Sequence, residues 1–414
     1  MKEPNCRSIV PSKNLWEIAI EFMGKIDTKL MEFNLKFAYL VYKFCKIEGI
    51  PNRFTKKLVF LACFNDVGKL YNSENAASTL IETYLFLKYF SPLKNFSEIL
   101  LVQNKKLKLS ISYSDGNRWY LIKKFTENLF KLNSQEEAYS KLLEDKDQFN
   151  HLDLVALGKI VKKTDIFYEI NSMHYKTVIF KYISKMIFST REKNEFFTML
   201  SSLFEMYSAQ TLYHSKVTAI IAYKIAKYMK LKNNRCKKIY VAGLAHDLGK
   251  VCIPLKILEK PDKLTDSEYS RMKKHVEFTK EILKNKMDYD VIEIAYRHHE
   301  RIDGSGYPNK IDGEHLTIDQ KILQVADVIS ALVAKRSYKE AWSIEKTIAI
   351  LDENVNNNKL SMEVVECFKI NKDKILKASN NLMKQADKIY DKLNTEREML
   401  VQWFIKIKLL YYFL

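Results

Sequence analysis

The stretch VAGLAHDLGK, residues 241–250, closes an apolar helical run with a histidine and an aspartate side by side. Neighbouring side chains on a helix point about 100° apart, because one turn takes about 3.6 residues. Such a pair can therefore reach two metal ions at once. Taken alone, a pair of this kind is more often a buried core histidine followed by an ordinary helix end. The other histidines of the chain decide between these interpretations.

The composition favours helices over strands. Apolar residues make up 47% of the 414 residues, whereas the chain has only 10 glycines and 7 prolines, too few for the turns of many strands. Apolar residues recur at intervals of three and four through residues 14–47 and 175–188, which is the helical period. We therefore predict an all-α protein.

The cysteines, the hydropathy and the net charge indicate where the protein is located and which kind of ligand it binds. The six cysteines show no paired spacing, which is typical of reduced thiols in a cytoplasmic protein. The chain shows neither a signal peptide nor an apolar run of about 18 residues, so we expect no transmembrane segment. The net charge of +18 is spread along the chain without an arginine-rich block. It suits an anionic ligand but does not predict a nucleic-acid polymer as partner.

An internal repeat divides the chain. Residues 42–69, YKFCKIEGIPNRFTKKLVFLACFNDVGK, align without a gap with residues 223–250, YKIAKYMKLKNNRCKKIYVAGLAHDLGK. Both copies end in Asp-x-Gly-Lys, but the first copy has Asn65 at the position of His246 and Phe33 at the position of His214. We predict two helical domains, residues 1–170 and 171–414. The first would be a copy without metal ligands.

Six of the eight histidines fall between residues 214 and 315, and five of these six suit a metal site. They lie at the ends of separate predicted helices, so only a folded helical bundle could bring them together. Neutral imidazole suits iron, manganese, zinc or nickel, and a carboxylate can bridge two such ions. Asp327 lies in a strongly apolar helix, where an ionised carboxylate is costly to bury without a cation. The set predicts a metal centre.

At this point the sequence resembles a known family. His214, HDLGK at 246–250, His275, HHERIDGSGYP at 298–308 and Asp327 follow one another as in the HD-GYP phosphodiesterases, a branch of the HD phosphohydrolases. The resemblance covers residues 200–345. It implies an all-helical HD fold in the second domain and hydrolysis of cyclic dinucleotides at a centre of two or three metal ions, often iron or manganese.

The resemblance also implies roles for individual residues. The expected metal ligands are His214, His246, Asp247, His275, His298, His299 and Asp327, with Asp247 as the bridge between ions. Lys250 matches the lysine that contacts the scissile phosphate, and Asp247 and Lys250 are the expected catalytic residues. Tyr307 lies in the glycine-rich loop that lines the substrate pocket. Arg336 and Lys339 match a phosphate-binding pair, although a solvated surface position is the alternative for both.

Two positions depart from the family pattern. Ser337 replaces the usual proline and would loosen the turn between the two phosphate-binding cations. Gln210 stands one turn before His214, where members with three metal ions have a glutamate. A neutral amide oxygen is a weaker ligand for a hard cation than a carboxylate. We therefore expect two divalent ions, iron or manganese, and no third.

These expectations combine into a function. The second domain would hydrolyse a cyclic dinucleotide, cyclic di-GMP in the first instance, to the linear dinucleotide or to GMP. No separate general base is needed, because bound metal ions lower the pKa of water. Alternatives are hydrolysis of another cyclic dinucleotide such as cyclic GMP-AMP, or a signalling module that binds a nucleotide without turnover. The first domain would serve packing, homodimerisation or contact with a signalling protein.

Overall fold

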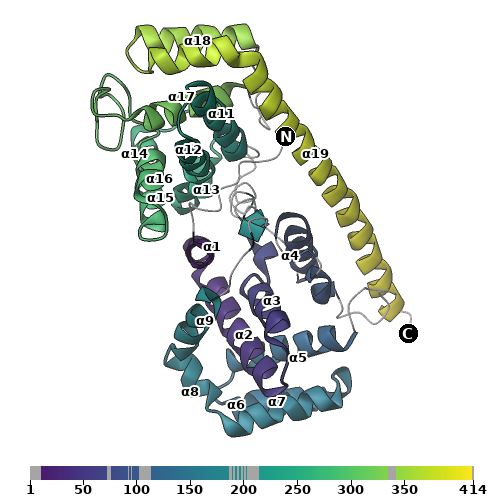
Figure 1. Cartoon of the computed structure of the whole chain (residues 1–414). Helices are drawn as coiled ribbons and strands as arrows, with labels where there is room; N and C mark the ends of the chain where they lie inside the picture. Colours follow the sequence, from purple (N-terminus) through teal and green to yellow (C-terminus); the bar gives the residue numbers. More distant parts are fainter. Residues whose placement is uncertain are drawn as a thin grey trace. The chain divides into compact units, whose positions relative to one another are not determined.

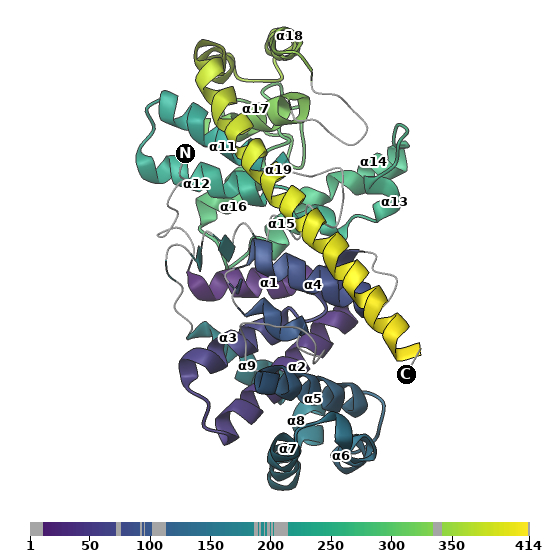
Figure 2. The same ribbon diagram turned by 90° about the vertical axis from the view of Figure 1, so that its right-hand side faces the viewer.

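The computed structural model describes residues 11–71, 76–101 except 92 and 95, 113–185, seven residues between 189 and 202, 214–333 and 342–412. Helices account for the regular structure of this described part, which contains no strand, and the predicted all-α fold class is confirmed. Figure 1 shows the helices, and Figure 2 shows them after a quarter turn. Among the described residues, no helix combines the length and the apolar composition that crossing a bilayer requires.

Contacts between Cα atoms divide the chain into two compact units. The C-terminal unit consists of Met1–Ile26 and Phe188–Lys392, and the N-terminal unit consists of Asp27–Ile187 and Leu393–Leu414. This division differs from the expected boundary at residue 170 at both chain ends, because the first helix groups with the C-terminal unit and the end of the last helix with the N-terminal unit. The expected boundaries remain a prediction about independently folding domains.

The C-terminal unit is built from helices, most of them shorter than the last one, α19. Its elements are α1 (Ser12–Ile26), α11 (His214–Tyr228), α12 (Asn233–Ala245), η5 (Leu248–Cys252), α13 (Leu255–Leu258), α14 (Asp266–Lys273), α15 (His275–Leu283), α16 (Tyr289–Tyr296), α17 (Ile318–Val333), α18 (Ile344–Asn356) and α19 (Met362–Tyr412) as far as Lys392. Helix α11 packs against α12 and α17, and α15 packs against η5 and α16. These contacts gather the helix ends that carry the predicted metal ligands.

The N-terminal unit contains the other helices. They are α2 (Thr28–Ile47), α3 (Asn52–Cys63), η1 (Val67–Tyr71), α4 (Ala76–Phe90), η2 (Ser97–Leu101), α5 (Tyr113–Leu129), α6 (Gln135–Glu144), η3 (Lys146–Gln148), α7 (His151–Lys163), α8 (Ile166–Asn171) and α9 (His174–Ser184), together with α19 from Leu393 onward. The end of α19 is fixed within this unit, since Glu396 accepts hydrogen bonds from Tyr84 and Tyr89 and Arg397 pairs with Glu82.

The two units repeat the same order of packed helices. Helix α2 packs against α3 and α5 in the N-terminal unit, as α11 packs against α12 and α17 in the C-terminal unit. The short elements correspond too, since η1 packs on α4 and η5 packs on α15. Both η1 and η5 follow directly after an aspartate, Asp66 in one unit and Asp247 in the other. This correspondence agrees with the internal repeat of the sequence.

Local sequence signals account for several helix ends. The side chain of Asp27 accepts a hydrogen bond from the backbone N–H of Leu30 and so caps α2. A capping box between Thr265 and Glu268 begins α14, where each side chain bonds the other residue's backbone N–H. Such caps satisfy N–H groups that have no partner inside the helix, and each contributes about 1 kcal/mol to stability.

A close approach between α11 and α12 sets the position of the first ligands. A Cβ atom added at Gly243 of α12 would lie 2.7 Å from the Cα atom of Ala219 on α11. Real Cβ atoms do not come so near a backbone atom, so only glycine permits this spacing. His246 follows Gly243 by three residues, and His214 begins the opposing helix. The spacing of the two helices therefore fixes how far apart these two histidines lie.

Replacing Gly243 with leucine should separate α11 from α12 and destabilise the C-terminal unit. Overpacking of a well-packed core costs about 1–3 kcal/mol, so we expect a clear loss of unfolding free energy in denaturant titrations. Asn234→Leu is the control, because Asn234 lies on the exposed side of the same helix. Equal stabilities of the two variants would show that the close approach is not required.

Candidate metal centre

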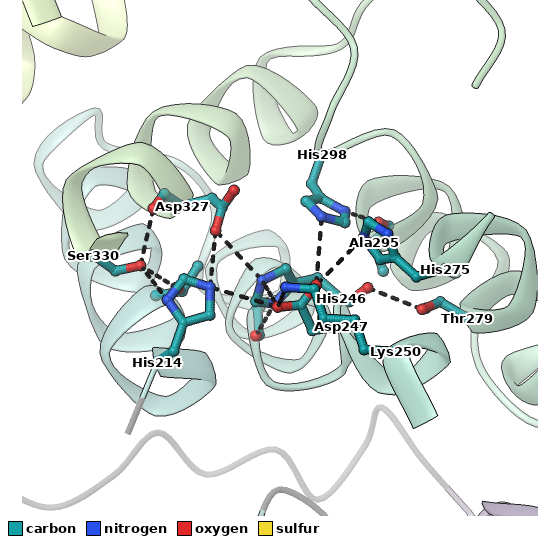
Figure 3. Close-up of polar contacts among 12 residues, drawn as sticks. His214, His246, Asp247, Lys250, His275, Thr279, Ala295, His298, Asp327 and Ser330 are labelled. Atoms are coloured by element: carbon teal, nitrogen blue, oxygen red, sulfur yellow. Dashed lines mark hydrogen bonds and ion pairs between the residues drawn. The ribbon is translucent and has the colours of Figure 1, made fainter. Parts of the chain in front are cut away.

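The structure brings all seven predicted ligand residues together from five helices, six of them at helix ends and Asp327 from within a helix. His214 begins α11, His246 and Asp247 follow α12, His275 begins α15, His298 and His299 follow α16, and Asp327 lies within α17. Figure 3 shows most of these side chains pointing toward Asp247. Arg336 and Lys339 lie outside the described residues, as do Gln210 and Ser337, so the expectations about them remain predictions.

The ligand atoms form two groups. His214, His246 and Asp247 present one group, and His275, His298 and His299 present the other, with the atoms of each group within 4.8 Å of one another. Each group is compact enough to surround a single metal ion. The arrangement therefore offers two adjacent positions for ions.

Asp247 lies between the two groups, and each of its carboxylate oxygens faces one of them. Oδ2 lies 3.6 Å from Nε2 of His214 and 3.3 Å from Nε2 of His246. Oδ1 lies 3.5 Å from Nε2 of His275 and 3.8 Å from Nε2 of His298. This is the orientation that a bridging carboxylate needs, and it follows from the adjacency of His246 and Asp247 at the end of one helix.

Asp327 adds a second carboxylate to the first group. Its Oδ1 lies 3.1 Å from Nε2 of His214 and 3.5 Å from Nε2 of His246. The first group then has two imidazoles and two carboxylates, whereas the second has three imidazoles and shares Asp247. Mixed imidazole and carboxylate sets suit borderline divalent ions such as iron and manganese.

Several atoms of the centre are buried without a hydrogen-bond partner among the described residues. They are Nε2 of His246, His275 and His298 and Oδ1 of Asp247. A buried polar atom without a partner costs about 1–3 kcal/mol, and natural proteins keep few of them. Four such atoms aimed at one small region fit divalent cations, which would satisfy all of them. The residues present therefore fit a two-ion centre.

The charge states of the imidazoles suit ligation. Burial lowers the pKa of His275 to about 4 and that of His298 to about 3, so both rings are neutral at pH 7. Burial also lowers the pKa of His299 and of His214. A neutral imidazole has a free lone pair on one nitrogen, which is the form that binds metal.

His246 differs from the other rings. Burial disfavours its charged form, but the carboxylates of Asp247 and Asp327 outweigh burial and raise its pKa to about 10. Burial likewise opposes ionisation of Asp247, whose pKa His246 and Lys250 nevertheless hold well below the usual range. Without a metal ion, a proton on His246 thus compensates the two buried carboxylates. A cation would take over this compensation and release the proton.

Lys250 and Thr279 support the centre from the side of η5. Nζ of Lys250 donates to Oδ2 of Asp247 at 2.5 Å, so the lysine lies beside the carboxylate that both ligand groups face. The hydroxyl of Thr279 donates to the carbonyl of His246 at 3.0 Å and accepts from the N–H of Gly249 at 2.8 Å. Thr279 ties α15 to both sides of Asp247 and was not recognised in the sequence.

A buried glutamate shapes the loop that follows His299. Glu300 is fully buried, and its carboxylate accepts backbone hydrogen bonds from Asn309 at 2.6 Å and Ile311 at 3.1 Å. These bonds fold the glycine-rich loop back, and the ring of Tyr307 lies 4.7 Å from that of His299. The loop therefore brings Tyr307 to the edge of the second ligand group. The position of Glu300 next to the two histidines was the only sequence signal for this role.

The equivalent place in the N-terminal unit keeps the framework but not the ligands. The N–H of Gly68 donates to Thr83 at 2.9 Å, just as that of Gly249 donates to Thr279. A Cβ atom added at Gly68 would meet Thr79, whereas one added at Gly249 would meet His275. Thr79 thus occupies the third ligand position, in addition to Asn65 at the second.

A lysine neutralises the remaining aspartate of the N-terminal unit. Asp66 is 7% exposed, and its Oδ1 accepts a hydrogen bond from Nζ of Lys123 at 2.7 Å. Lys123 belongs to α5, the counterpart of α17, which carries Asp327 in the other unit. Lys69 lies 3.4 Å from the other oxygen of Asp66, as Lys250 lies beside Asp247. The ammonium of Lys123 therefore lies beside Asp66 in the N-terminal unit, whereas the predicted metal ligands lie beside Asp247 in the C-terminal unit.

Comparison with known proteins agrees with this geometry. Residues 198–364 match the family model described as HD domain. The chain is 39% identical over 170 residues to 3′3′-cGAMP-specific phosphodiesterase 2 of Vibrio cholerae, covering 40% of this chain and 33% of that protein. It is 40% identical over 134 residues to the cyclic di-GMP phosphodiesterase response regulator RpfG of Xanthomonas campestris, covering 32% of this chain and 35% of that protein. The chain thus spans about one third of the length of these relatives.

A solved structure extends the likeness of fold to most of the chain. The crystal structure of V-cGAP3, a cyclic GMP-AMP-specific phosphodiesterase of V. cholerae, superposes with a TM-score of 0.54 over 90% of this chain and 98% of that one. The sequence identity is 15%, so this likeness concerns the fold alone. The family match and the relatives confirm the resemblance seen in the sequence. Residues 198–364 of this chain match the HD domain family and are similar in sequence to cyclic dinucleotide phosphodiesterases, in agreement with the resemblance to the HD-GYP type.

Proposed function

We propose that the C-terminal unit hydrolyses a cyclic dinucleotide, cyclic di-GMP, with the help of two divalent metal ions. The observation that carries this proposal is the pair of buried ligand groups that share Asp247. Two ions side by side suit displacement at phosphorus, because they can clamp both the attacking and the leaving oxygen. The relatives of residues 198–364 include phosphodiesterases of cyclic di-GMP and of 3′3′-cGAMP, which supports this class of substrate.

Each ion would have four ligands from the chain. His214, His246, Asp247 and Asp327 would hold one ion, and Asp247, His275, His298 and His299 would hold the other. Iron or manganese suits this mixture of imidazole and carboxylate. When bound, such ions polarise the phosphate and lower the pKa of water toward neutrality. A third ion would need ligands beyond these seven residues, and we propose two.

Residues of the chain would bind and orient the phosphodiester. Lys250 lies beside the bridge and is partly exposed, so its ammonium can turn from Asp247 to a phosphate oxygen once cations compensate the carboxylate. Tyr307 would bound the pocket at the second ligand group. Arg336 and Lys339 would bind phosphate from the segment after α17. The positive charge of these residues would offset the charge that develops on the phosphate oxygens.

We propose that the N-terminal unit is a degenerate HD-type copy that binds no metal. Its helices follow the order of the C-terminal unit, but Phe33, Asn65 and Thr79 stand at ligand positions. Lys123 would replace the cations as the charge partner of Asp66. A unit of this kind is free to serve as a contact surface for a second copy of the chain or for a signalling protein.

Metal-loaded full-length protein should convert cyclic di-GMP to the linear product. Chromatography measures this conversion, with cyclic GMP-AMP and cyclic di-AMP tested as substrates in parallel. Asp247→Ala is the matched control and should lose both ions and turnover while its helical circular dichroism persists. The loss should be near total, because one carboxylate serves both ligand groups. Turnover by Asp247→Ala protein of verified metal content would refute the mechanism, and cleavage of cyclic GMP-AMP alone would reassign the substrate.

Lys250→Ala should keep both ions and slow the chemical step by about 10²–10³-fold, the usual effect of removing one charge-stabilising donor. Metal content by mass spectrometry and single-turnover rates separate these two quantities. Lys69→Ala, the equivalent change in the N-terminal unit, is the control and should leave the rate unchanged. An empty metal site in Lys250→Ala would show that this lysine serves the structure of the centre instead.

Lys123→Met should leave Asp66 with the half-exposed Lys69 as its remaining ion-pair partner and with Oδ1 unbonded. We expect the unfolding free energy of the N-terminal unit to fall by about 1–3 kcal/mol, the cost of a buried polar atom that loses its hydrogen-bond partner. The double variant Asp66→Asn, Lys123→Met should recover most of this loss, because asparagine is neutral and tolerates the positive φ of 58° at this position. Denaturant unfolding of the full-length variants measures both effects. A stoichiometric metal ion bound at Asp66 in the unmodified chain would contradict the degenerate assignment.

A further inference from the structure

Three of the buried histidines each make the same kind of hydrogen bond. Nδ1 of His246, His275 and His298 each lies 2.7 Å from the backbone carbonyl of the residue three positions earlier. A carbonyl oxygen only accepts, so each Nδ1 must carry the proton and donate it. In the neutral rings of His275 and His298, Nε2 is then left with its lone pair toward Asp247. At His246 the second proton lies on Nε2, and its release when a cation binds leaves the same free lone pair. The backbone thus fixes the tautomer that a metal ligand needs.

His214 has a different partner. It begins α11, and its Nδ1 lies 3.0 Å from the side-chain hydroxyl of Ser330 on α17. A hydroxyl can donate or accept, so this contact alone does not fix the tautomer. If Ser330 donated its proton to Nδ1, the ring proton would lie on Nε2, the nitrogen that faces Asp247 and Asp327. That form could not ligate through Nε2.

The other contacts of Ser330 determine the direction. Its hydroxyl donates to the backbone carbonyl of Asp327 at 3.0 Å, which uses its single proton. Its oxygen also lies 2.6 Å from the hydroxyl of Thr218, which can then only be the donor in this pair. Both hydroxyl side chains are fully buried, so water does not compete for these bonds. The oxygen of Ser330 is left to accept from Nδ1 of His214.

We propose that Ser330 is a positioning residue of the first ligand group, resting on the metal site proposed above. It holds His214 in the tautomer with a free Nε2, and it joins His214 on α11 to the backbone of Asp327 on α17. Thr218, one turn after His214, holds the hydroxyl of Ser330 in place. Ser330 thereby fixes the orientation of His214 relative to Asp327, although the two predicted ligands come from different helices.

The test compares metal binding in full-length variants loaded with Mn²⁺. Ser330→Ala should lower the affinity for one of the two ions by about 10–100-fold, which is the usual effect of losing a partner that orients a ligand. The affinity for the other ion should stay unchanged. Ser330→Thr keeps the hydroxyl and should restore most of the affinity. Stoichiometry by mass spectrometry and affinity by titration give readouts that do not depend on turnover.

Ser379→Ala is the matched control. Ser379 is also fully buried in a helix, and its hydroxyl also donates to the carbonyl three residues earlier, that of Leu376, at 3.0 Å. It should lose similar stability in thermal unfolding and keep both ions at full affinity. Equal Mn²⁺ affinities in Ser330→Ala and Ser379→Ala would overturn the role of Ser330. Absence of Mn²⁺ from the unmodified protein would instead overturn the proposed metal site.

Discussion

The carboxylate of Asp247 is the constraint on which the C-terminal unit depends. It is buried at 1% exposure among four imidazoles, a lysine and a second carboxylate. An ionised group at such depth is tolerated only with strong compensation, because its desolvation costs several kcal/mol. His246 and Lys250 supply part of this compensation, yet Oδ1 still lacks a partner among the described residues. The remaining imbalance fits a site that binds divalent cations.

The helices around Asp247 can be understood as the means of bringing ligands from distant parts of the sequence within a few ångströms. Glycines at 243 and 249 let backbones approach so closely that a methyl group would not fit. Thr279 then ties α15 to the chain on both sides of the aspartate, and Glu300 folds the following loop with its carboxylate. Small residues thus set the distances, and buried polar side chains set the orientations.

The all-α fold class and the residues that gather around Asp247 could be predicted from the sequence, because helical periodicity and the histidine motifs are local patterns. Ser330, Thr279 and Glu300 could not be assigned in the same way. Serine and threonine in an apolar helix look like ordinary small residues until the partner helix is placed against them. Lys123 was hidden for a related reason, since its pairing with Asp66 joins residues 57 positions apart in a chain rich in lysine.

The pair of Asp66 and Lys123 has a consequence for how the two units respond to their surroundings. A bound ion exchanges with the medium and can be withdrawn by a chelator or by scarcity of the element, whereas an ammonium on a side chain stays attached to the polypeptide. With the metal centre proposed above, the stability of the folded C-terminal unit would depend on metal availability, whereas that of the N-terminal unit would not. When metal is scarce, the N-terminal unit of the chain would then stay folded, and the stability of the C-terminal unit would fall.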